Sequence, residues 1–443
     1  MAEVCVIGAG LAGCEAAVKL AERGVAVNLY EMKPGRYSPA HSNPGFAELV
    51  CSNSLKAMSI ENASGLLKEE MRVLGSVCVE AALMSKVPAG QALAVDRDTF
   101  SKLITEKIES IENIKVIREE VKSISELPPC DAVIIATGPL TSESLAGDIG
   151  GITGKEGLKF FDAAAPIVYA ESVDTEKTFK AARYGKGTAD YINCPMTKDE
   201  YYAFYDALVS AETAEVEEFD SIHLYEGCMP VEEMAKRGRD TLKFGPLKPV
   251  GLQNPDGTRP YAVVQLRQDD KDGTLFNIVG FQTRLKFPEQ RRVFGMIPGL
   301  ENAEYARYGV MHRNTYIKSP GILNAAYRLT ESKKPAIYFA GQITGVEGYM
   351  ESASSGIVAG INCAREVLGE EPAIFPVSTV IGALANYAAN YGGKDFQPMG
   401  ANFGIVDSSA AANVKTRDKA AKKRLVAENS LRTLEQFISE KSI

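Results

Sequence analysis

The chain has 443 residues, which is enough for a large buried core and more than one domain. Its content of 45% hydrophobic and 24% charged residues is ordinary for a globular protein, and no run of about 18 apolar residues is present to span a membrane. The net charge of −8 argues mildly against a nucleic-acid partner, and eight scattered cysteines exclude a disulfide scaffold. The opening MAEVCVIG lacks the features of a signal peptide, so we expect a cytoplasmic protein.

The first 31 residues predict a strand, a glycine turn, a helix and a second strand. The strands are EVCVIG and VAVNLYE, and the helix CEAAVKLAERG ends at Gly24. Gly8, Gly10 and Gly13 form a GxGxxG pattern directly after the first strand, where glycines let the backbone approach a pyrophosphate at a helix N-terminus. Glu31 ends the second strand, where its carboxylate can accept hydrogen bonds from ribose hydroxyls. The pattern predicts a dinucleotide-binding site.

Two later segments favour FAD over NAD as the tightly bound dinucleotide. CDAVIIATGP (130–139) predicts a buried strand, and AIYFAGQITGVEGYMESASSGIVAGINCA (336–364) predicts a strand, a glycine loop and a small-residue helix. The pair resembles the returning strand and the flavin-side helix of two-dinucleotide-fold flavoproteins, although plain α/β packing would also suit small residues. The backbone N–H groups at the start of that helix can point at the flavin or the pyrophosphate. The cofactor residues expected here are Gly138, Gly341, Gly348 and Tyr349.

The middle of the chain has a different sequence pattern. Strand-like runs such as YAVVQLRQ and LFNIVGFQT alternate with Gly/Pro turns. We therefore expect an α/β, Rossmann-like FAD-binding domain made of residues 1–165 and 325–443, with an α+β domain inserted at 166–324. Residues 414–441 predict a closing amphipathic helix.

The cysteines fall into two groups. Six lie mostly in apolar or helical patterns, where a thiol packs as a small hydrophobe: Cys5, Cys14, Cys78, Cys130, Cys194 and Cys363. Cys51 and Cys228 instead stand beside Ser, Asn, Gly and Pro, where a reactive thiol or a structural turn residue is expected. The spacing of the cysteines and of the three histidines predicts no metal site.

Positive charge gathers inside the predicted insertion despite the acidic total. Residues 234–292 hold twelve Lys/Arg against six Asp/Glu, and a second basic cluster, KTRDKAAKKR, lies at 415–424. Such runs are either solvated faces or contacts for nucleic acid. The candidates for phosphate contacts are Lys236, Arg237, Arg239, Lys243 and Lys248.

Several long strings closely resemble one family, the folate- and FAD-dependent tRNA uracil-5 methyltransferases known as TrmFO. The resemblance runs essentially end to end and rests on GAGLAGCEAA, PAHSNPGFAELVCSNSL, VPAGQALAVDRDTF, ATGPLTSE, YINCPMTKDEY, FGPLKPVGL, VVQLRQDDK, GVMHRNTY and GVEGYMESASSG. The related GidA/MnmG family shares the fold but is considerably longer.

The resemblance implies a reaction and roles for particular residues. A one-carbon unit from 5,10-methylenetetrahydrofolate would reach carbon 5 of the T-loop uridine of tRNA by way of FAD, with NADPH or NADH as reductant. A thiolate adding to carbon 6 activates carbon 5 of uracil. By resemblance Cys228 is the nucleophile and Cys51 acts near the flavin. His312 would stack on the folate pterin, with Arg313 and Asn314 as polar contacts.

Other assignments stay open at this point. Arg97 either touches the nucleotide or forms a surface salt bridge, and Tyr349 and Glu351 are either cofactor contacts or capping or packing residues. The same chemistry on ribosomal RNA, a GidA-like wobble-uridine modifier and a non-catalytic flavin-bearing RNA-binding protein are the alternatives to the tRNA methyltransferase. The sequence does not predict the oligomeric state.

Overall fold

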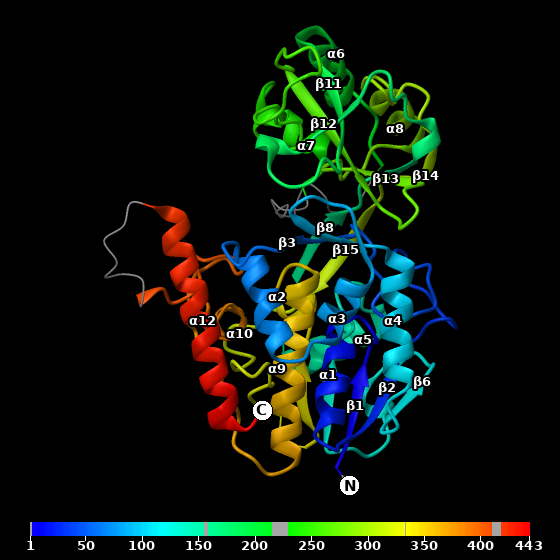
Figure 1. Cartoon of the computed structure of the whole chain (residues 1–443). Coiled ribbons are helices and arrows are strands. Elements are labelled where there is room, and N and C mark those ends of the chain that lie inside the picture. Colours follow the sequence, from blue (N-terminus) through cyan, green and yellow to red (C-terminus); the bar gives the residue numbers. More distant parts are fainter. Residues whose placement is uncertain (1, 155–157, 215–228, 333, 410–417) are drawn as a thin grey trace.

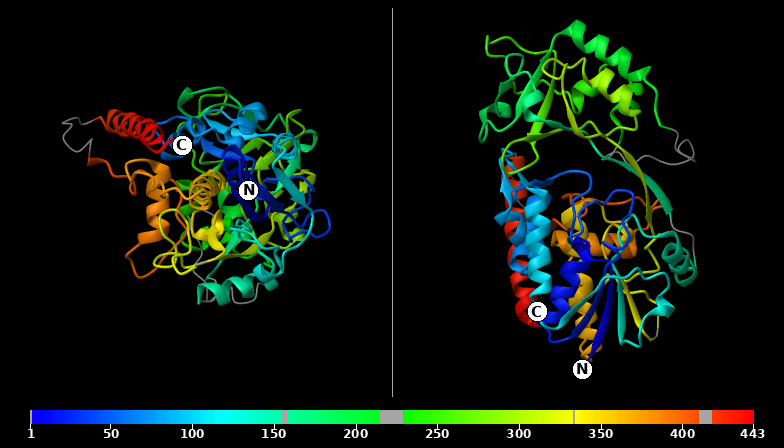
Figure 2. Two further views of the ribbon diagram at one scale, coloured as in Figure 1. Left: turned by 90° about the horizontal axis from the view of Figure 1, so that it is seen from below. Right: turned by 90° about the vertical axis from the view of Figure 1, so that its right-hand side faces the viewer.

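The computed structural model describes residues 2–154, 158–214, 229–332, 334–409 and 418–443. These residues form two lobes (Figure 1). The lower lobe holds the first and last parts of the chain, and the upper lobe holds the middle, drawn in green. Both chain ends lie at the far end of the lower lobe, as the views in Figure 2 also show.

A five-stranded parallel sheet forms the centre of the lower lobe. Its order is β16-β7-β1-β2-β6, and the register places Val4 beside Val27 on one side and Ala132 on the other. The strands are short, apolar and mostly buried on both faces, as parallel strands between helices require. Their bounds are β1 Glu3–Ile7, β2 Ala26–Tyr30, β6 Ile114–Ile117, β7 Ala132–Ile135 and β16 Ala336–Phe339. The predicted union of early and late segments in one Rossmann-like sheet is confirmed.

Helix α1 (Leu11–Glu22) packs closely against α9 (Tyr349–Val367), a neighbour more than 300 residues away in the chain (Figure 1). The approach requires glycine on α9. A Cβ on Gly356 would overlap the carbonyl oxygen of Ala12, and one on Gly360 would lie 2.8 Å from Ala16. Small residues on both helices therefore let the two backbones meet.

The remaining helices of the lower lobe surround this pair, and a small antiparallel sheet of order β3-β5-β4 lies toward the upper lobe. The helices are α2 Ala63–Val73, α3 Val77–Met84, α4 Arg97–Glu109, α5 Glu143–Thr153, α10 Val380–Asn390 and α12 Lys419–Lys441, and the strands are β3 Ser54–Ala57, β4 Lys86–Val87 and β5 Ala92–Val95. The predicted C-terminal helix is α12. Within the described ranges, no helix is long and apolar enough to cross a lipid bilayer.

The upper lobe is a six-stranded sheet with helices packed against it. Its order is β10-β11-β12-β13-β9-β14, with antiparallel pairs throughout. Tyr201, Phe204, Phe281 and Phe294 fill its separate core. The elements are β9 Ile167–Tyr169, β10 Phe179–Lys180, β11 Ile192–Met196, β12 Ala262–Gln268, β13 Leu275–Ile278, β14 Tyr305–Arg307, α6 Lys198–Val209, α7 Val231–Lys236 and α8 Phe287–Phe294. YAVVQLRQ and LFNIVGFQT indeed supply strands β12 and β13.

A two-stranded antiparallel ribbon connects the lobes. It pairs β8 (Leu158–Ala163) with β15 (Met311–Tyr316), and Ala163 lies opposite Met311. The chain thus leaves the lower lobe along β8 and returns along β15 (Figure 1). The domain limits at 165 and 325 stay a prediction, and they fall near this ribbon.

Two buried carboxylates cap helices across the lower lobe. Glu15 of α1 accepts a hydrogen bond from the Cys78 N–H at 3.0 Å, at the start of α3. Glu70 of α2 accepts from the Val380 and Ile381 N–H groups, both at 2.8 Å, and from Ser430 Oγ at 2.6 Å. Burial raises the pKa of Glu70 to about 7, against the opposing effect of these donors.

The contact between α1 and α9 predicts a sharp difference between two Gly→Ala substitutions. Gly356→Ala should destabilise the chain by about 1–3 kcal/mol, because its Cβ has no room beside Ala12. Gly147→Ala is the matched control, since it lies on α5 with no atom within 4 Å of the new Cβ. That variant should be neutral or more stable by about 0.5–1 kcal/mol. Thermal unfolding measures both, and equal melting temperatures would contradict the packing argument.

Glu70 predicts a pH dependence of stability. Its folded-state pKa of about 7 lies above the ordinary value of 4.5, so the folded chain binds the proton more tightly than the unfolded chain does. The stability that protonation contributes is therefore present at acidic pH and is lost as pH rises through about 7, on the order of 2 kcal/mol. Denaturant unfolding between pH 5 and 8 should show a flatter profile for Glu70→Gln than for the wild type. Parallel profiles would show that Glu70 does not titrate in this range.

Candidate active site

The turn after β1 forms one end of a cavity in the lower lobe. Gly8 has φ +99°, and a Cβ there would lie 2.7 Å from the Ala136 oxygen. A Cβ on Gly13 would overlap the Gly8 carbonyl, so both glycines are required by the protein itself. Gly10 differs, because its φ is −75° and a Cβ would meet no atom within 4 Å. Since Gly10 caps α1 and lines the cavity, the open space beside it fits a phosphate group at the helix N-terminus.

Glu31 holds this turn from the end of β2. Its carboxylate accepts hydrogen bonds from the N–H groups of Ala9 and Lys33, each at 3.0 Å. The residue is buried and lines the same cavity. Each oxygen keeps a second lone pair that can accept from a ribose hydroxyl, a contact that stays a prediction.

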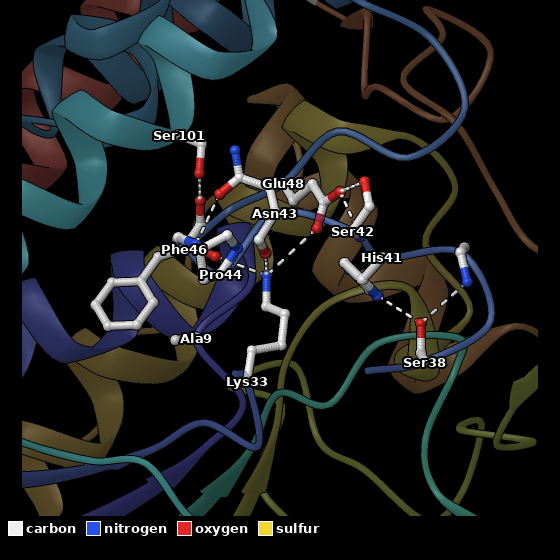
Figure 3. A network of polar contacts seen from close by, with 12 residues as sticks. Ala9, Lys33, Ser38, His41, Ser42, Asn43, Pro44, Phe46, Glu48 and Ser101 are labelled. Carbon is white, nitrogen blue, oxygen red and sulfur yellow. Dashed lines mark hydrogen bonds and ion pairs between the residues drawn. The ribbon is translucent and has the colours of Figure 1, made fainter. Parts of the chain in front are cut away.

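Lys33, which lines the cavity, holds the loop that follows β2 through its side chain (Figure 3). Its ammonium group donates to the carbonyl oxygens of Asn43, at 3.0 Å, and Gly45, at 2.6 Å, and lies 3.5 Å from Glu48. On the same loop, His41 Nδ1 lies 2.5 Å from the Ser38 hydroxyl. Burial and the nearby Lys33 charge lower the pKa of His41, so its ring is neutral at pH 7. Lys33, His41 and Glu48 all line the cavity.

The cavity has a volume of about 440 Å³, within the range of cofactor sites. It extends from the start of α1 to the start of α9. Five stretches far apart in sequence line most of it: 8–12, 30–33, 47–56 in part, 136–142 and 347–352. Gly138, Gly341, Gly348 and Tyr349 are all among the lining residues, as is Asn314 of β15. The structure thus brings together the predicted cofactor residues, except Gly13 and Arg97, around one space.

Cys51 lies at the α9 end of the cavity, against Tyr349. Its Sγ is 3.0 Å from the Tyr349 hydroxyl oxygen, and its own N–H donates to that oxygen at 2.9 Å. The Ser52 N–H also donates to it, at 3.3 Å. Because the oxygen already accepts two N–H groups, its own proton is directed to the sulfur. Burial raises the pKa of Tyr349 well above its ordinary value, so the phenol keeps that proton.

The segment around Cys51 is held in an unusual backbone conformation. Ala47 and Lys56, on either side of it, have φ of +49° and +66°, a region that non-glycine residues rarely adopt. The Ala47 N–H is bonded to Ala9, and the Lys56 ammonium lies 2.7 Å from the buried Glu351. Glu351 in turn accepts from the Ala401 N–H at 3.0 Å. These contacts fix the thiol relative to both helix starts.

Arginines from both lobes meet behind this segment. Arg97 donates to the Leu49 carbonyl at 3.1 Å and pairs with Asp269 of the upper lobe at 3.0 Å. Arg267 donates to Asn53 at 3.0 Å and to Ser52 at 2.8 Å. Burial lowers the pKa of Arg267, but a guanidinium starts so high that it stays charged. The interlobe contacts therefore place fixed positive charge near Cys51.

Arg97 does not line the cavity. Its position fits neither of the two predicted roles, a nucleotide contact or a surface salt bridge, completely. Its side chain is 14% exposed and forms an interlobe ion pair rather than a surface one. Its contact with the nucleotide stays a prediction. The loop 36–48, Lys56 and Arg267 belong to the site but were not predicted, although PAHSNPGFAELVCSNSL contains most of the loop and VVQLRQDDK contains Arg267.

Three other groups of predicted site residues either lie away from the cavity or fall partly or wholly outside the described residues. Cys228 is outside the described residues. The backbone of His312 and Arg313 belongs to β15, opposite Asp162 and Phe161, but their side chains are outside the described part. The five basic candidates lie together on the upper lobe: Lys236, Arg237, Arg239, Lys243 and Lys248. The ion pairs that the structure describes there join Lys236 with Glu233, Arg239 with Asp206 and Lys243 with Asp240.

Five of the other described cysteines are more deeply buried than Cys51. Cys5, Cys14, Cys78, Cys194 and Cys363 are buried, as predicted, and Cys130 is partly buried. Burial raises the pKa of Cys194 to about 12 and those of Cys14, Cys78 and Cys363 well above their ordinary values. These thiols stay protonated. Among the described side chains, no group of three or more His, Cys, Asp or Glu is placed to hold a metal ion.

The fold and this cavity define a class, the GidA-like proteins with an FAD-binding fold of Rossmann type. The family model described as glucose inhibited division protein A matches residues 3–371. A solved structure of GidA from Aquifex aeolicus superposes with a TM-score of 0.69 at 18% identity, covering 99% of this chain and 73% of that chain. At that identity the likeness shows the fold alone, and it confirms the predicted fold class.

Full-length relatives identify the family within this class. The chain is 60% identical over 438 residues to a protein of Acetivibrio thermocellus named methylenetetrahydrofolate–tRNA-(uracil-5-)-methyltransferase TrmFO, covering 99% of each chain. Proteins of the same name from Caldicellulosiruptor bescii and Anoxybacillus flavithermus are 57% and 55% identical, over 97% and 99% of this chain and 97% and 100% of those proteins. The chain belongs to the TrmFO family.

The open space at Gly10 predicts a variant that folds but loses its cofactor. Gly10→Ala should leave the stability of the cofactor-free protein unchanged, because the new Cβ touches no protein atom. It should weaken FAD binding about tenfold or more, since the methyl group occupies the space beside the helix N-terminus. Flavin absorbance after titration with FAD measures this. Gly151→Ala, equally open but on α5, is the control, and equal FAD affinity in all three proteins would contradict the assignment.

Proposed function

We propose that this chain transfers a one-carbon unit from 5,10-methylenetetrahydrofolate to carbon 5 of a uridine in tRNA, with FAD as cofactor and NADPH or NADH as reductant. Membership of the TrmFO family supports the substrates, through the reaction that names its members. The observation that carries the proposal is the Cys51 thiol, held against Tyr349 at the α9 end of the cavity. The alternative is that the substrate is ribosomal RNA, and the test must distinguish it from tRNA.

The chemistry explains why such a thiol is needed. Carbon 5 of uracil is a poor nucleophile until a thiolate adds to carbon 6 and makes the ring enolate-like. After carbon 5 gains its substituent, a base must remove the proton from that carbon so that the thiol can leave. A protein that methylates uracil in this way therefore needs a nucleophilic thiol and a base that can take the proton from carbon 5 of the ring.

The residues that line the cavity have two further roles, binding the cofactor and positioning Cys51. FAD, when bound, would supply the redox chemistry of the transfer. The Gly10 turn and the start of α1 would bind its pyrophosphate, Glu31 would bind a ribose, and the start of α9 at Gly348 would hold the flavin end. Tyr349 is a positioning residue, because its hydroxyl orients the Cys51 sulfur and stabilises negative charge on it.

The two cysteines then have distinct roles. We assign Cys228 as the nucleophile at carbon 6 and Cys51 as the group that takes the carbon-5 proton or holds an adduct beside the flavin. The position of Cys51 on the cavity wall supports its part. Cys228 precedes Pro230 and α7, and its assignment rests on the family resemblance.

The ribbon and the upper lobe supply the substrate contacts in this proposal. His312 stacks on the folate pterin with Arg313 beside it, a role that the position of the next residue, Asn314, on the cavity wall supports. The inserted domain, 166–324, binds tRNA through its basic candidates, Lys236, Arg237, Arg239, Lys243 and Lys248. The target uridine of the T-loop must leave its stack to reach a cavity inside the lower lobe.

A labelling experiment tests the reaction. Purified protein with FAD is incubated with unmodified tRNA, methylenetetrahydrofolate labelled at the methylene and NADPH or NADH. We expect labelled 5-methyluridine in the digested tRNA. Cys228→Ala and Cys51→Ala should give none, while both keep bound FAD and affinity for tRNA. No label with wild-type protein and tRNA would contradict the proposal, and label only in ribosomal RNA would establish the alternative.

Tyr349→Phe tests the positioning role separately. The ring remains on the cavity wall, so FAD should still bind, but the hydroxyl that contacts Cys51 is lost. Loss of one such hydrogen bond should lower kcat about 5- to 100-fold, with little change in the KM for tRNA. A fall in flavin content without a fall in kcat per bound flavin would show that Tyr349 acts only on cofactor binding.

A further inference from the structure

Three aromatic rings form a continuous stack on the upper lobe. Phe287 and Tyr308 lie 4.5 Å apart between ring centroids with an interplanar angle of 16°. Tyr308 and Tyr305 continue the stack at 4.9 Å and 9°. In the core of the same lobe, by contrast, Phe281 and Phe294 meet edge to face at 80°.

The stack is anchored at one end and open at the other. Tyr305 belongs to β14 and is mostly buried, and its hydroxyl donates to the Gln290 carbonyl at 3.3 Å. Phe287 is the first residue of α8 and is 50% exposed. One face of its ring lies on Tyr308, so the exposed part is the end of the stack. An apolar ring presented in this way can accept a further flat ring at little entropic cost.

Positive charge lies beside the middle ring of the stack. The Arg291 Nε donates to the Tyr308 hydroxyl, and its guanidinium is 5.5 Å from that ring. Within the described part of the chain, Arg291 has no carboxylate partner within ion-pair distance. It is an exposed residue of α8, and it can reach a phosphate without giving up an ion pair described here.

The stack is also close to the candidate active site along the chain. Tyr308 directly follows Arg307. Burial and the nearby Arg97 lower the pKa of Arg307, while the nearby Tyr349 and Glu48 act in the opposite direction on that pKa. Arg307 therefore lies in the charged surroundings of Cys51, at the junction of the lobes. Phe287 itself is not part of the cavity wall, so the open end of the stack lies outside the cofactor space.

We propose that Phe287 receives an unpaired nucleobase of the RNA substrate on the open end of the stack, while Arg291 contacts a neighbouring phosphate. The inference rests on the proposed function and adds a surface to it. Aromatic rings stack on any base, and a cation beside the ring suits the backbone of a single strand or loop. The platform would hold the RNA next to the uridine that enters the cavity.

Binding measurements on the FAD-loaded protein test this. Phe287→Ala should weaken binding of unmodified tRNA about 5- to 100-fold, and Phe287→Trp should restore it. Leu368→Ala removes an equally exposed apolar side chain at the end of α9 and should have no effect. An RNA duplex without unpaired bases should bind the wild type and Phe287→Ala alike. In methylation assays, Phe287→Ala should raise the KM for tRNA by a similar factor, while the folate KM stays unchanged.

Arg291→Gln separates the phosphate contact from the stack. The slope of log affinity against log salt should fall by about one for this variant and stay unchanged for Phe287→Ala. Wild-type affinity in Phe287→Ala, with methylation of tRNA intact, would overturn the stacking proposal alone. A raised folate KM with unchanged RNA affinity would assign the ring to folate and also overturn it. Failure of the wild type to bind or methylate tRNA would instead overturn the proposed function, and this inference with it.

Discussion

The close contact of α1 with α9 is the constraint on which the site depends. Each helix starts beside the cavity, at Gly10 and at Gly348, and each presents the backbone N–H groups of its first turn and a positive dipole end there. Two such ends can meet one ligand only if the helices approach at backbone distance, which Gly356 and Gly360 permit. A dinucleotide, with its pyrophosphate near one end and its ring system near the other, suits this arrangement.

The second lobe completes the site through charge rather than through the cavity wall. Arg267 reaches the Cys51 segment at Ser52 and Asn53, while Asp269 holds Arg97 from above. The segment is thus fixed by its strained ends, by Tyr349 and by the upper lobe together. This explains how a thiol in a polar turn can be held for reaction, whereas the buried thiols, such as Cys194, stay protonated and serve packing.

Local patterns were enough to predict the frame of the fold. The GxGxxG turn, its flanking strands and the late strand and helix each follow from neighbouring residues, and the family strings added the substrates. The contact of Cys51 with Tyr349 joins residues 298 apart, and the Phe287–Tyr308 stack depends on how α8 lies against β14. No periodicity shows such pairs, because three-dimensional packing decides them. The buried place of Arg97 was undetermined for the same reason, since its partner Asp269 belongs to the other lobe.

A crystal structure of the chain with FAD bound tests the central claim most directly. The account predicts the pyrophosphate against Gly10 at the start of α1, and the flavin ring at the start of α9, in van der Waals contact with the Cys51 sulfur. A flavin ring bound away from Cys51 and Tyr349, or a pyrophosphate away from the Gly10 turn, would contradict it.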